Sequence, residues 1–271
     1  FAFLCKERSG GGRGRVAIIG GGPAGLAATG YLVCQGYEVD VYEKQPIAGG
    51  MMMFAIPPYR VVREGLLAGL EDLEKNFSVK FFTKTKVFCG EKPRHDEGDA
   101  FVERIVDLKK IIDEYDAVIL TTGTWRSREL GIPGSEVKGV YSALEYLYEW
   151  WVYEYKFSTH APPVGRKVVV IGGGLSAIDA AEVSLMKGAH EVYLVYRRTI
   201  KEAPAGEYEV RRVVREGVKW IELAAPNRIV VENGTLKGVE FVRMRLGEPD
   251  ESGRPRPVPI PGSEFIIEAD L

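Results

Sequence analysis

The chain contains one pattern twice, and this repeat limits the folds open to it more than any other feature. Residues 15–44 and residues 167–198 match position by position at an offset of 152, with one insertion near Ala189. Each copy has a basic residue, a short apolar run, clustered glycines, an alanine-rich segment, a glycine and a second apolar run. This order predicts a strand, a turn, a helix and a strand in each copy.

Both copies have the features of a parallel sheet with helical crossovers. The first strands, Val16–Ile19 and Val168–Ile171, are continuous and rich in β-branched residues, as in strands buried on both faces. Helices are expected at about 24–35 and 176–187, each followed by a glycine that can end it. Because such βαβ units build doubly wound sheets, we predict an α/β fold with two Rossmann-like domains.

The first copy contains Gly-x-Gly-x-x-Gly directly after its strand. Gly20 allows a tight turn, Gly22 lets the backbone approach a pyrophosphate, and Gly25 lets the helix pack closely on the strand. Pro23 suits the first turn of a helix, where its missing N–H has no partner to lose. Glu43 follows 23 residues after Gly20, where an acid accepts the hydroxyls of an adenosine ribose. This copy predicts a dinucleotide site, the alternative being a tight turn with no ligand.

The second copy carries small residues at the same three positions, Gly172, Gly174 and Ala177. Its counterpart of Glu43 is Tyr196, which is followed by Arg197 and Arg198. An acid would repel the 2′-phosphate of NADP, whereas a guanidinium binds it through charge-assisted hydrogen bonds. The second site is therefore predicted to bind NADP(H). The alternative is that the two arginines are an ordinary solvated surface pair.

The remaining segments extend this organisation. Residues 116–120 predict a buried strand, and residues 153–163 look like a connection between domains. Residues 247–261 are rich in Pro, Gly and charge and predict a loop, whereas residues 265–271 predict a further strand. A helix is expected at 207–216, with strands at 218–223, 228–231 and 239–246.

Five ordered segments resemble one family of flavoproteins. They are VAIIGGGPAGLAAT at 16–29, VYEKQPIAGGMMMFAIPPYR at 41–60, YDAVILTTGTWRSRELGIPG at 115–134, VVVIGGGLSAIDAA at 168–181 and VYRRTIKEAPA at 195–205. These segments are similar to the two-dinucleotide-binding flavoproteins, above all to the glutamate synthase small (beta) subunit group. That group includes the large subunit of NADH-dependent ferredoxin:NADP oxidoreductase and the matching part of dihydropyrimidine dehydrogenase.

The resemblance implies a division into domains. An FAD-binding domain would occupy residues 1–158, an NAD(P)H-binding domain inserted in it would occupy 159–265, and residues 266–271 would begin the return to the FAD domain. The C-terminal half of the FAD domain is expected to be missing and to come from a longer parent chain or a separate subunit. The family's cysteine-rich, cluster-binding N-terminal region is likewise expected to be missing, unless Cys5 is its last remnant.

The resemblance also implies the residues that hold each cofactor. For FAD they are Gly20, Gly22, Pro23, Ala24 and Gly25 at the pyrophosphate, Glu43 and Lys44 at the adenosine end, Gly49, Gly50 and Met51 along the flavin, Arg60 near its far end, Val87 at the adenine, and Thr122 and Gly123 over the cofactor. For NADPH they are Gly172, Gly173, Gly174, Leu175, Ser176 and Ala177 at the phosphates, and Arg197 and Arg198 at the 2′-phosphate.

Two departures from the family pattern affect these roles. Leu175 stands where the family usually has a polar Asn, which removes one expected contact with a phosphate or ribose. Residues 51–54 read Met-Met-Met-Phe instead of a Leu/Tyr-like run, and methionine is an adaptable core residue. We therefore expect this run to serve mainly as packing.

Composition argues against several other functions. The formal net charge of -2 offers no attraction to nucleic acid or to an anionic membrane, and no apolar run approaches the roughly 20 residues of a spanning helix. The cytoplasm is therefore the predicted location. The cysteines at 5, 34 and 89 form no Cys-x-x-Cys, which argues against a metal site or redox dithiol and suits a reducing compartment. Scarce Asn and Gln beside abundant Lys, Arg and Glu hint at a thermophilic source.

Hydride transfer between bound cofactors requires placement rather than acid–base chemistry, so no catalytic residue is predicted. The three histidines, His95, His160 and His190, lie outside every motif and are expected on the surface. The leading hypothesis is an NAD(P)H-linked flavin subunit that passes electrons to a partner's iron–sulfur cluster. Two alternatives stay open, a self-contained flavoprotein reductase of a small molecule and a non-catalytic nucleotide-binding subunit. The electron acceptor and the direction of electron flow also stay open.

Overall fold

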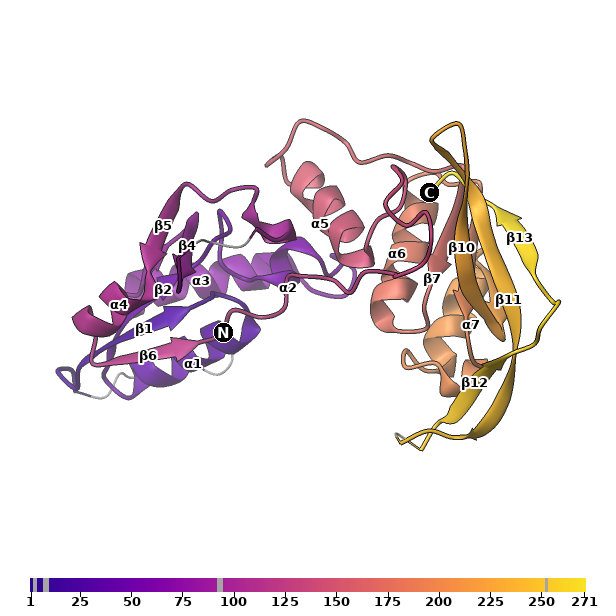
Figure 1. The fold of residues 1–271 in the computed structure, drawn as a ribbon. Coiled ribbons are helices and arrows are strands. Elements are labelled where there is room, and N and C mark those ends of the chain that lie inside the picture. Colours follow the sequence, from indigo (N-terminus) through magenta and orange to yellow (C-terminus); the bar gives the residue numbers. More distant parts are fainter. Residues whose placement is uncertain (2–3, 7–9, 92–94, 252) are drawn as a thin grey trace. The chain divides into compact units, whose positions relative to one another are not determined.

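The chain folds into two compact units, Phe1–Ser127 and Arg128–Leu271 (Figure 1). The computed structural model describes residues 1, 4–6, 10–91, 95–251 and 253–271. The division lies earlier in the chain than the predicted boundary at 158. The reason is the helix α5 (Ala143–Glu154), which buries its aromatic face against α6 (Leu175–Met186) of the second unit.

The first unit is built on a parallel sheet of four strands in the order β3-β2-β1-β6. Ile19 at the end of β1 pairs with Tyr42 of β2 on one side and with Leu120 of β6 on the other. The carboxyl ends of the three strands therefore meet at one edge of the sheet, where the glycine loop begins. The strands are β1 (Arg15–Ile19), β2 (Glu38–Tyr42), β3 (Lys80–Phe82) and β6 (Ala117–Leu120).

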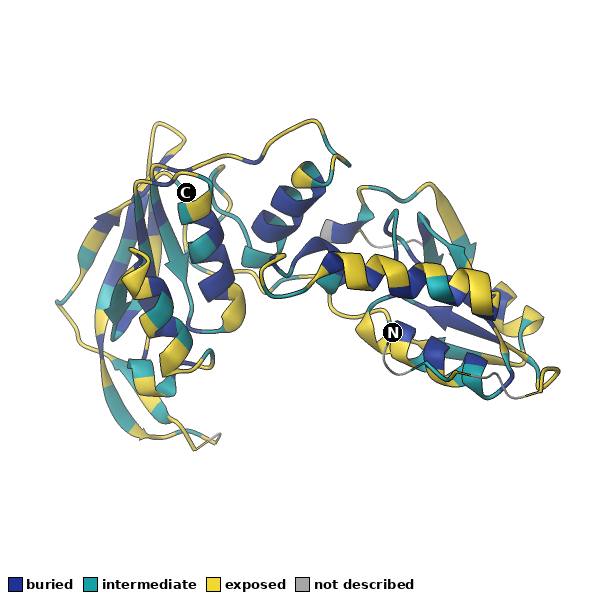
Figure 2. Ribbon diagram, turned by 180° about the vertical axis from the view of Figure 1, so that it is seen from behind, coloured by how far each residue is buried: buried dark blue, intermediate teal, exposed yellow. Residues whose placement is uncertain are grey.

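Helices cover this sheet through apolar faces. In α3, Leu66, Leu70, Leu73 and Phe77 recur at spacings of three or four and are buried, while most of the residues between them are exposed (Figure 2). In α1, Pro23 occupies the first turn as predicted. The helices are α1 (Pro23–Cys34), α2 (Met51–Phe54), α3 (Arg63–Phe77) and α4 (Leu108–Glu114). A smaller parallel pair joins β4 (Thr85–Phe88) to β5 (Arg104–Asp107), with a 3-10 turn, η1, at Glu97–Asp99.

The second unit repeats the parallel arrangement with the strand order β7-β8-β9. Its core joins Val168 of β7 and Leu194 of β8 to Ile178 of α6 and Val213 of α7, all buried. The predicted α/β class with parallel sheets is therefore confirmed in both units. The elements are β7 (Lys167–Ile171), β8 (Glu191–Tyr196), β9 (Lys219–Glu222), α7 (Glu207–Arg215) and a 3-10 turn, η2 (Ile200–Glu202).

An antiparallel sheet completes the second unit around one long strand, β11 (Thr235–Pro249), which pairs with β10 (Ala224–Glu232), β12 (Pro255–Pro259) and β13 (Phe265–Glu268). Two expectations differ from this sheet. The segment 247–261 was expected to be a loop but contains β12, and residues 266–271 were expected to return to the first domain. Instead β13 pairs with β11, and the Asp270 carboxylate accepts hydrogen bonds from the backbone N–H groups of Arg166 and Lys167.

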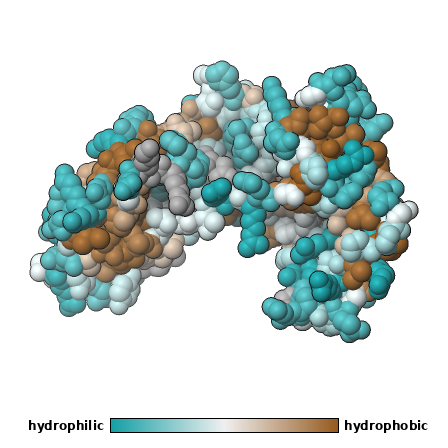
Figure 3. Space-filling model, in the orientation of Figure 1, coloured by the Kyte–Doolittle hydropathy of each residue, from teal (hydrophilic) through white to brown (hydrophobic). Residues whose placement is uncertain are grey.

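Polar and charged side chains cover much of the visible surface, with apolar patches between them (Figure 3). Within the described part of the chain, no helix is both long enough and apolar enough to cross a membrane.

Candidate dinucleotide-binding sites

The first glycine loop follows β1 and leads directly into α1. Gly20 has a φ of 103°, and a Cβ atom there would lie 2.5 Å from the carbonyl oxygen of Thr121. A Cβ atom on Gly25 would lie 2.0 Å from the carbonyl oxygen of Gly20. Both positions therefore require glycine for the fold itself. At Gly22 the nearest atom to such a Cβ is the Cα of Gly50, 4.0 Å away. The protein leaves space there that a ligand can use.

Thr121 holds this loop in place, a role that the sequence analysis missed. Its hydroxyl donates to the carbonyl oxygen of Gly20 at 2.7 Å, and its N–H donates to the carbonyl oxygen of Ile19 at 2.8 Å. Thr122 follows it, with its Cα 3.0 Å from the Cβ position of Gly20. A threonine placed directly after a predicted strand was the available signal.

Glu43 lies at the carboxyl edge of the sheet, one residue after β2. Its side chain is buried, and its carboxylate accepts hydrogen bonds from the N–H groups of Gly21 at 2.8 Å and Gln45 at 2.9 Å. Burial raises the pKa of this carboxyl group, while the two hydrogen bonds oppose the shift. The carboxylate is therefore fixed against the glycine loop, where the ribose acceptor is predicted.

Lys44 is engaged by a set of residues that the sequence analysis did not single out. Its ammonium forms an ion pair with Asp96, lies 3.7 Å from a carboxylate oxygen of Asp99, and sits 4.4 Å above the ring of Trp125. Gln45 also donates to the carbonyl oxygen of Gly98 at 2.6 Å. These contacts join the end of β2 to the η1 turn. Polar side chains therefore line the place where the adenosine end of the cofactor is predicted.

The structure brings Gly49 and Gly50 to the same loop. The N–H of Gly49 donates to the carbonyl oxygen of Gly21 at 2.8 Å, and Gly50 has a φ of 53° and lies beside Gly22. Met51 then begins α2, in which Met53 and Phe54 are buried as the packing interpretation expects.

Three of the remaining predicted residues have less direct links to the loop. Val87 lies in β4 and pairs with Val106 of β5. The guanidinium carbon of Arg60 lies 5.7 Å from the centre of the Tyr59 ring. A Cβ atom added to Gly123 would meet no other atom within 4 Å.

The second glycine loop connects β7 to α6. Gly172 has a φ of 148°, and its N–H donates to the carbonyl oxygen of Val195 at 3.0 Å. A Cβ atom on Gly173 would lie 2.7 Å from the ring of Tyr196. Ala177 is buried where α6 meets the loop, while Leu175 and Ser176 are exposed at the start of the helix. The N-terminus of α6 is therefore open, with Gly174 as its N-cap.

The two predicted phosphate-binding arginines differ in their surroundings. Arg197 is exposed, whereas the side chain of Arg198 is 2% exposed. The guanidinium of Arg198 donates to the carbonyl oxygen of Pro255 at 2.7 Å and to the carboxylate of Asp250 at 2.7 Å.

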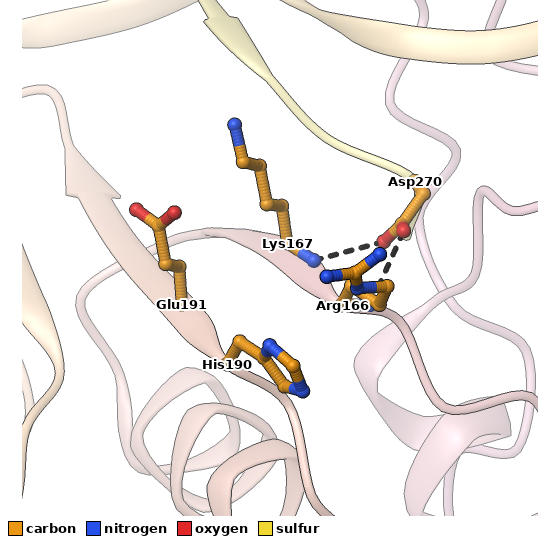
Figure 4. A pocket seen from close by; sticks show the side chains of 5 residues that line it. All are labelled: Arg166, Lys167, His190, Glu191 and Asp270. Carbon is orange, nitrogen blue, oxygen red and sulfur yellow. Dashed lines mark hydrogen bonds between the residues drawn. The ribbon is translucent and has the colours of Figure 1, made fainter.

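A polar pocket of about 270 Å³ lies at the amino ends of β7 and β8, the opposite ends from the glycine loop. Figure 4 shows Asp270 bonded to the backbone of Arg166 and Lys167, with His190 and Glu191 beside them. The side chain of Lys167 also donates to Glu268 at 2.7 Å. These contacts serve to fasten the segment after β13.

Cysteine pairing departs from the sequence expectation. Cys5 and Cys34 form a disulfide across 29 residues, while Cys89 is free and exposed. The two cysteines are too far apart in sequence to form a short-spacing motif. It arises because α1 runs back along the sheet, so that its last residue lies near the segment before β1. Among the described residues, no group of three or more His, Cys, Asp or Glu side chains could hold a metal ion.

Comparison with solved structures identifies the fold. FprA, an oxidoreductase of Mycobacterium tuberculosis, matches with a TM-score of 0.76 and 19% identity over 95% of this chain and 69% of that chain. Thioredoxin reductase of Lactococcus lactis matches with a TM-score of 0.58 and 22% identity over 94% of this chain and 75% of that chain. At these identities the likeness is one of fold.

Several relatives share a larger fraction of identical residues with this chain than these solved structures do. The NADP(+)-dependent formate dehydrogenase subunit beta of Moorella thermoacetica is 38% identical over 95% of this chain and 34% of its own length. The NADPH-Fe(3+) oxidoreductase subunit beta of Geobacter sulfurreducens is 39% identical over 94% of this chain and 36% of its own length. The glutamate synthase [NADPH] small chain of Escherichia coli is 34% identical over 94% of this chain and 52% of its own length. The chain thus spans about a third to a half of the length of these relatives.

The predicted resemblance to the glutamate synthase small subunit group is confirmed by these relatives. A family model described as pyridine nucleotide-disulphide oxidoreductase matches residues 14–251, which is most of the chain. The chain therefore belongs to the pyridine nucleotide-disulphide oxidoreductases, a family of NAD(P)H-dependent flavin oxidoreductases.

Proposed function

We propose that the first unit binds FAD, that the second binds NADPH, and that a hydride passes from the nicotinamide to the flavin. The supporting observation is a difference at matching positions of the two glycine loops. The carboxylate of Glu43 lies against Gly21, whereas the ring of Tyr196 lies against Gly173. A carboxylate accepts hydrogen bonds from a ribose diol, as FAD offers. An uncharged ring does not repel a 2′-phosphate, as NADPH carries.

The residues around each loop suit these cofactors. The open side of Gly22 leaves room for a pyrophosphate at the N-terminus of α1, and the exposed start of α6 leaves room for the phosphates of NADPH. Bound FAD would supply the chemistry by accepting a hydride and releasing its electrons singly. The chain's own residues would bind and orient the two cofactors, so no acid or base is assigned.

The names of the relatives, together with the family resemblance, support a proposal for the electron acceptor. Two of the relatives are named as beta subunits and one as a small chain, and this chain spans only part of each. We propose that electrons pass on to an iron–sulfur centre in a partner subunit or in another segment of the same protein. That partner or segment would also complete the FAD site.

A visible spectrum of the purified protein tests the proposal. When the protein is purified together with the partner or segment that completes the FAD site, incubated with FAD and passed through a desalting column, it is expected to retain a flavin band that NADPH bleaches under anaerobic conditions. Retention without bleaching would contradict hydride transfer and would favour a non-catalytic nucleotide-binding subunit. Rapid turnover of a small-molecule acceptor by the protein alone would favour a self-contained reductase. A Gly22→Ala variant, predicted to fold but to exclude the pyrophosphate, is the matched control.

A further inference from the structure

We propose that the Cys5–Cys34 disulfide is a redox-sensitive latch that controls how firmly the first unit holds FAD. While the bond is intact, a short N-terminal strap that includes Phe1, Leu4 and Cys5 braces α1 and α3, the helices that support the glycine loops of that unit. Reduction of the bond by a dithiol releases the strap and loosens the loops. The effect on FAD rests on the proposed FAD site, whereas the effect on the loops is measured without the cofactor.

One end of the strap is fixed to α1 by the disulfide. Cys34 is the last residue of the helix, and the Cα atoms of the two cysteines lie 5.8 Å apart. The helix has 12 residues and starts after its N-cap, Gly22. At 1.5 Å per residue the bond therefore lies about 18 Å along the helix from the glycine loop. From there it is placed to hold α1 in position rather than to exchange electrons directly with a flavin.

The other end of the strap occupies a notch in α3. A Cβ atom added to Gly69 would lie 2.6 Å from the ring of Phe1. Gly69 is buried in the interior of this 15-residue helix, where glycine is less favourable than alanine. The ring of Phe1 gives a reason for glycine at this position, because a side chain there would displace it. Within the strap, the N–H of Leu4 donates to the carbonyl oxygen of Phe1 at 3.1 Å.

Helix α3 in turn supports the loop at Gly49 and Gly50. A Cβ atom added to Gly49 would lie 2.8 Å from Cδ2 of Leu66, which lies one turn before Gly69. The N–H of Gly49 donates to the carbonyl oxygen of Gly21 at 2.8 Å. The strand order β3-β2-β1 with right-handed crossovers places α1 and α3 on the same face of the sheet, so one short segment can reach both. The strap therefore braces both sides of the predicted pyrophosphate site.

The latch opens by thiol–disulfide exchange. Cys5 and Cys34 are both only half-buried, so a thiolate from solvent can reach the bond. The thiolate of a dithiol attacks one sulfur, the Cys5–Cys34 bond breaks, and a mixed disulfide forms with the attacked cysteine. The second thiol of the dithiol then attacks this intermediate and becomes part of the donor's own disulfide. Two electrons and two protons have then passed to the protein, which carries two free thiols.

Hydrogen–deuterium exchange tests the latch without FAD. The oxidised protein and the same protein reduced with dithiothreitol would be compared in a Cys89→Ser background, which removes the free thiol. Reduction is expected to speed exchange at least about fivefold in the amides of residues 20–25 and 49–51, and to leave β7–β9 of the second unit unchanged. Cys5→Ser, which lies outside every helix and strand, is expected to exchange like the reduced protein with or without dithiothreitol.

The rate of FAD release tests the consequence for the cofactor. It would be followed by flavin fluorescence on the protein purified with the partner or segment that completes the FAD site, after dithiothreitol has been removed under argon. Reduction is expected to speed release at least about fivefold, reoxidation is expected to restore the slow rate, and the dissociation constant for NADPH is expected to stay the same.

Two glycines of α3 supply a matched pair of variants. Gly69→Ala fills the notch of Phe1, so its oxidised form is expected to release FAD about as fast as the reduced protein. Gly65→Ala adds the same methyl group where no atom lies within 4 Å, and is expected to behave like wild type. Both changes favour the helix, so loss of the fold does not explain a difference between them.

The latch is overturned if loop exchange is the same in both redox states, if Cys5→Ser still responds to dithiothreitol, or if oxidised Gly69→Ala releases FAD at the wild-type rate. Equal FAD release from the oxidised and the reduced protein overturns it as well. A protein that retains FAD in neither redox state, but whose loops still loosen on reduction, contradicts the proposed function and leaves the latch in place.

Discussion

Individual glycines of the first loop serve different purposes, and two substitutions separate them. Gly25→Ala would put a methyl group 2.0 Å from the Gly20 carbonyl oxygen, so we expect a loss of about 1–3 kcal/mol in the free energy of unfolding. Gly22 has an ordinary extended backbone (φ −73°), and the space beside it is open. The free energy of unfolding of Gly22→Ala should therefore stay within about 0.5 kcal/mol of the wild-type value, while its affinity for FAD should fall sharply. Denaturant unfolding and flavin retention measure the two effects. Retention of FAD by Gly22→Ala would show that no pyrophosphate passes there.

The carboxylate of Glu43 is expected to make FAD binding sensitive to acid. Burial raises its pKa above the ordinary value, and hydrogen bonds donated by ribose hydroxyls would favour the ionised form. FAD affinity is therefore expected to be constant above the raised pKa and to fall as the pH decreases through it. Fluorescence titration with FAD between about pH 8 and pH 4 measures this. Glu43→Gln should bind FAD more weakly and lose the dependence, whereas an unchanged pH profile in that variant would assign the effect to another group.

The same group affects the stability of the protein without FAD, with the opposite sign. A carboxyl group whose pKa is higher in the folded than in the unfolded state binds more protons when folded. Its contribution to the free energy of unfolding therefore falls as the pH rises from the unfolded pKa to the folded one.

Helix α1 is held at both ends, by the glycine loop at its start and by a disulfide at its last residue. Because the Cys5–Cys34 bond closes a loop of 29 residues, its reduction is expected to lower the free energy of unfolding by about 3–4 kcal/mol. Urea unfolding with and without a reducing agent measures this difference. Cys34→Ser should unfold like the reduced protein, and Cys89→Ser should unfold like wild type, since Cys89 is free. Equal midpoints for oxidised and reduced protein would contradict a stabilising disulfide.

At the scale of the whole molecule, two units with separate cores are expected to respond separately to ligands. The first unit has a core around Ala17 and Ile19, and the second has one around Ile178 and Leu194. NADPH at about 100 times its dissociation constant should stabilise the second unit by about 2.7 kcal/mol. Calorimetry is therefore expected to show two unfolding transitions, of which NADPH raises the midpoint temperature of one. In Arg197→Ala the same NADPH concentration is expected to raise that midpoint less. Equal shifts of both transitions would contradict separate sites.

Much of this organisation could be predicted from local sequence. The repeat predicted both βαβ units, and its glycines lie where the close contacts of Gly20, Gly25 and Gly173 require them. The alignment of Glu43 with Tyr196 also agrees with the structure, since each faces the corresponding glycine. The strand β12 was missed because three prolines lie in five residues. On an edge strand, prolines that do not need to donate a hydrogen bond are tolerated.

The sequence by itself determined the two strand–glycine loop–helix units, because apolar periodicity, turn glycines and a proline at a helix start act over a few residues. Only the tertiary structure decided which groups meet across long separations. Arg198 finds Asp250 52 residues away, Cys5 finds Cys34, and the last strand pairs with β11. Arg197 and Arg198 are alike in sequence, yet one is exposed and the other is buried. The burial of a charge depends on which distant segment covers it, and no local pattern encodes that segment's position.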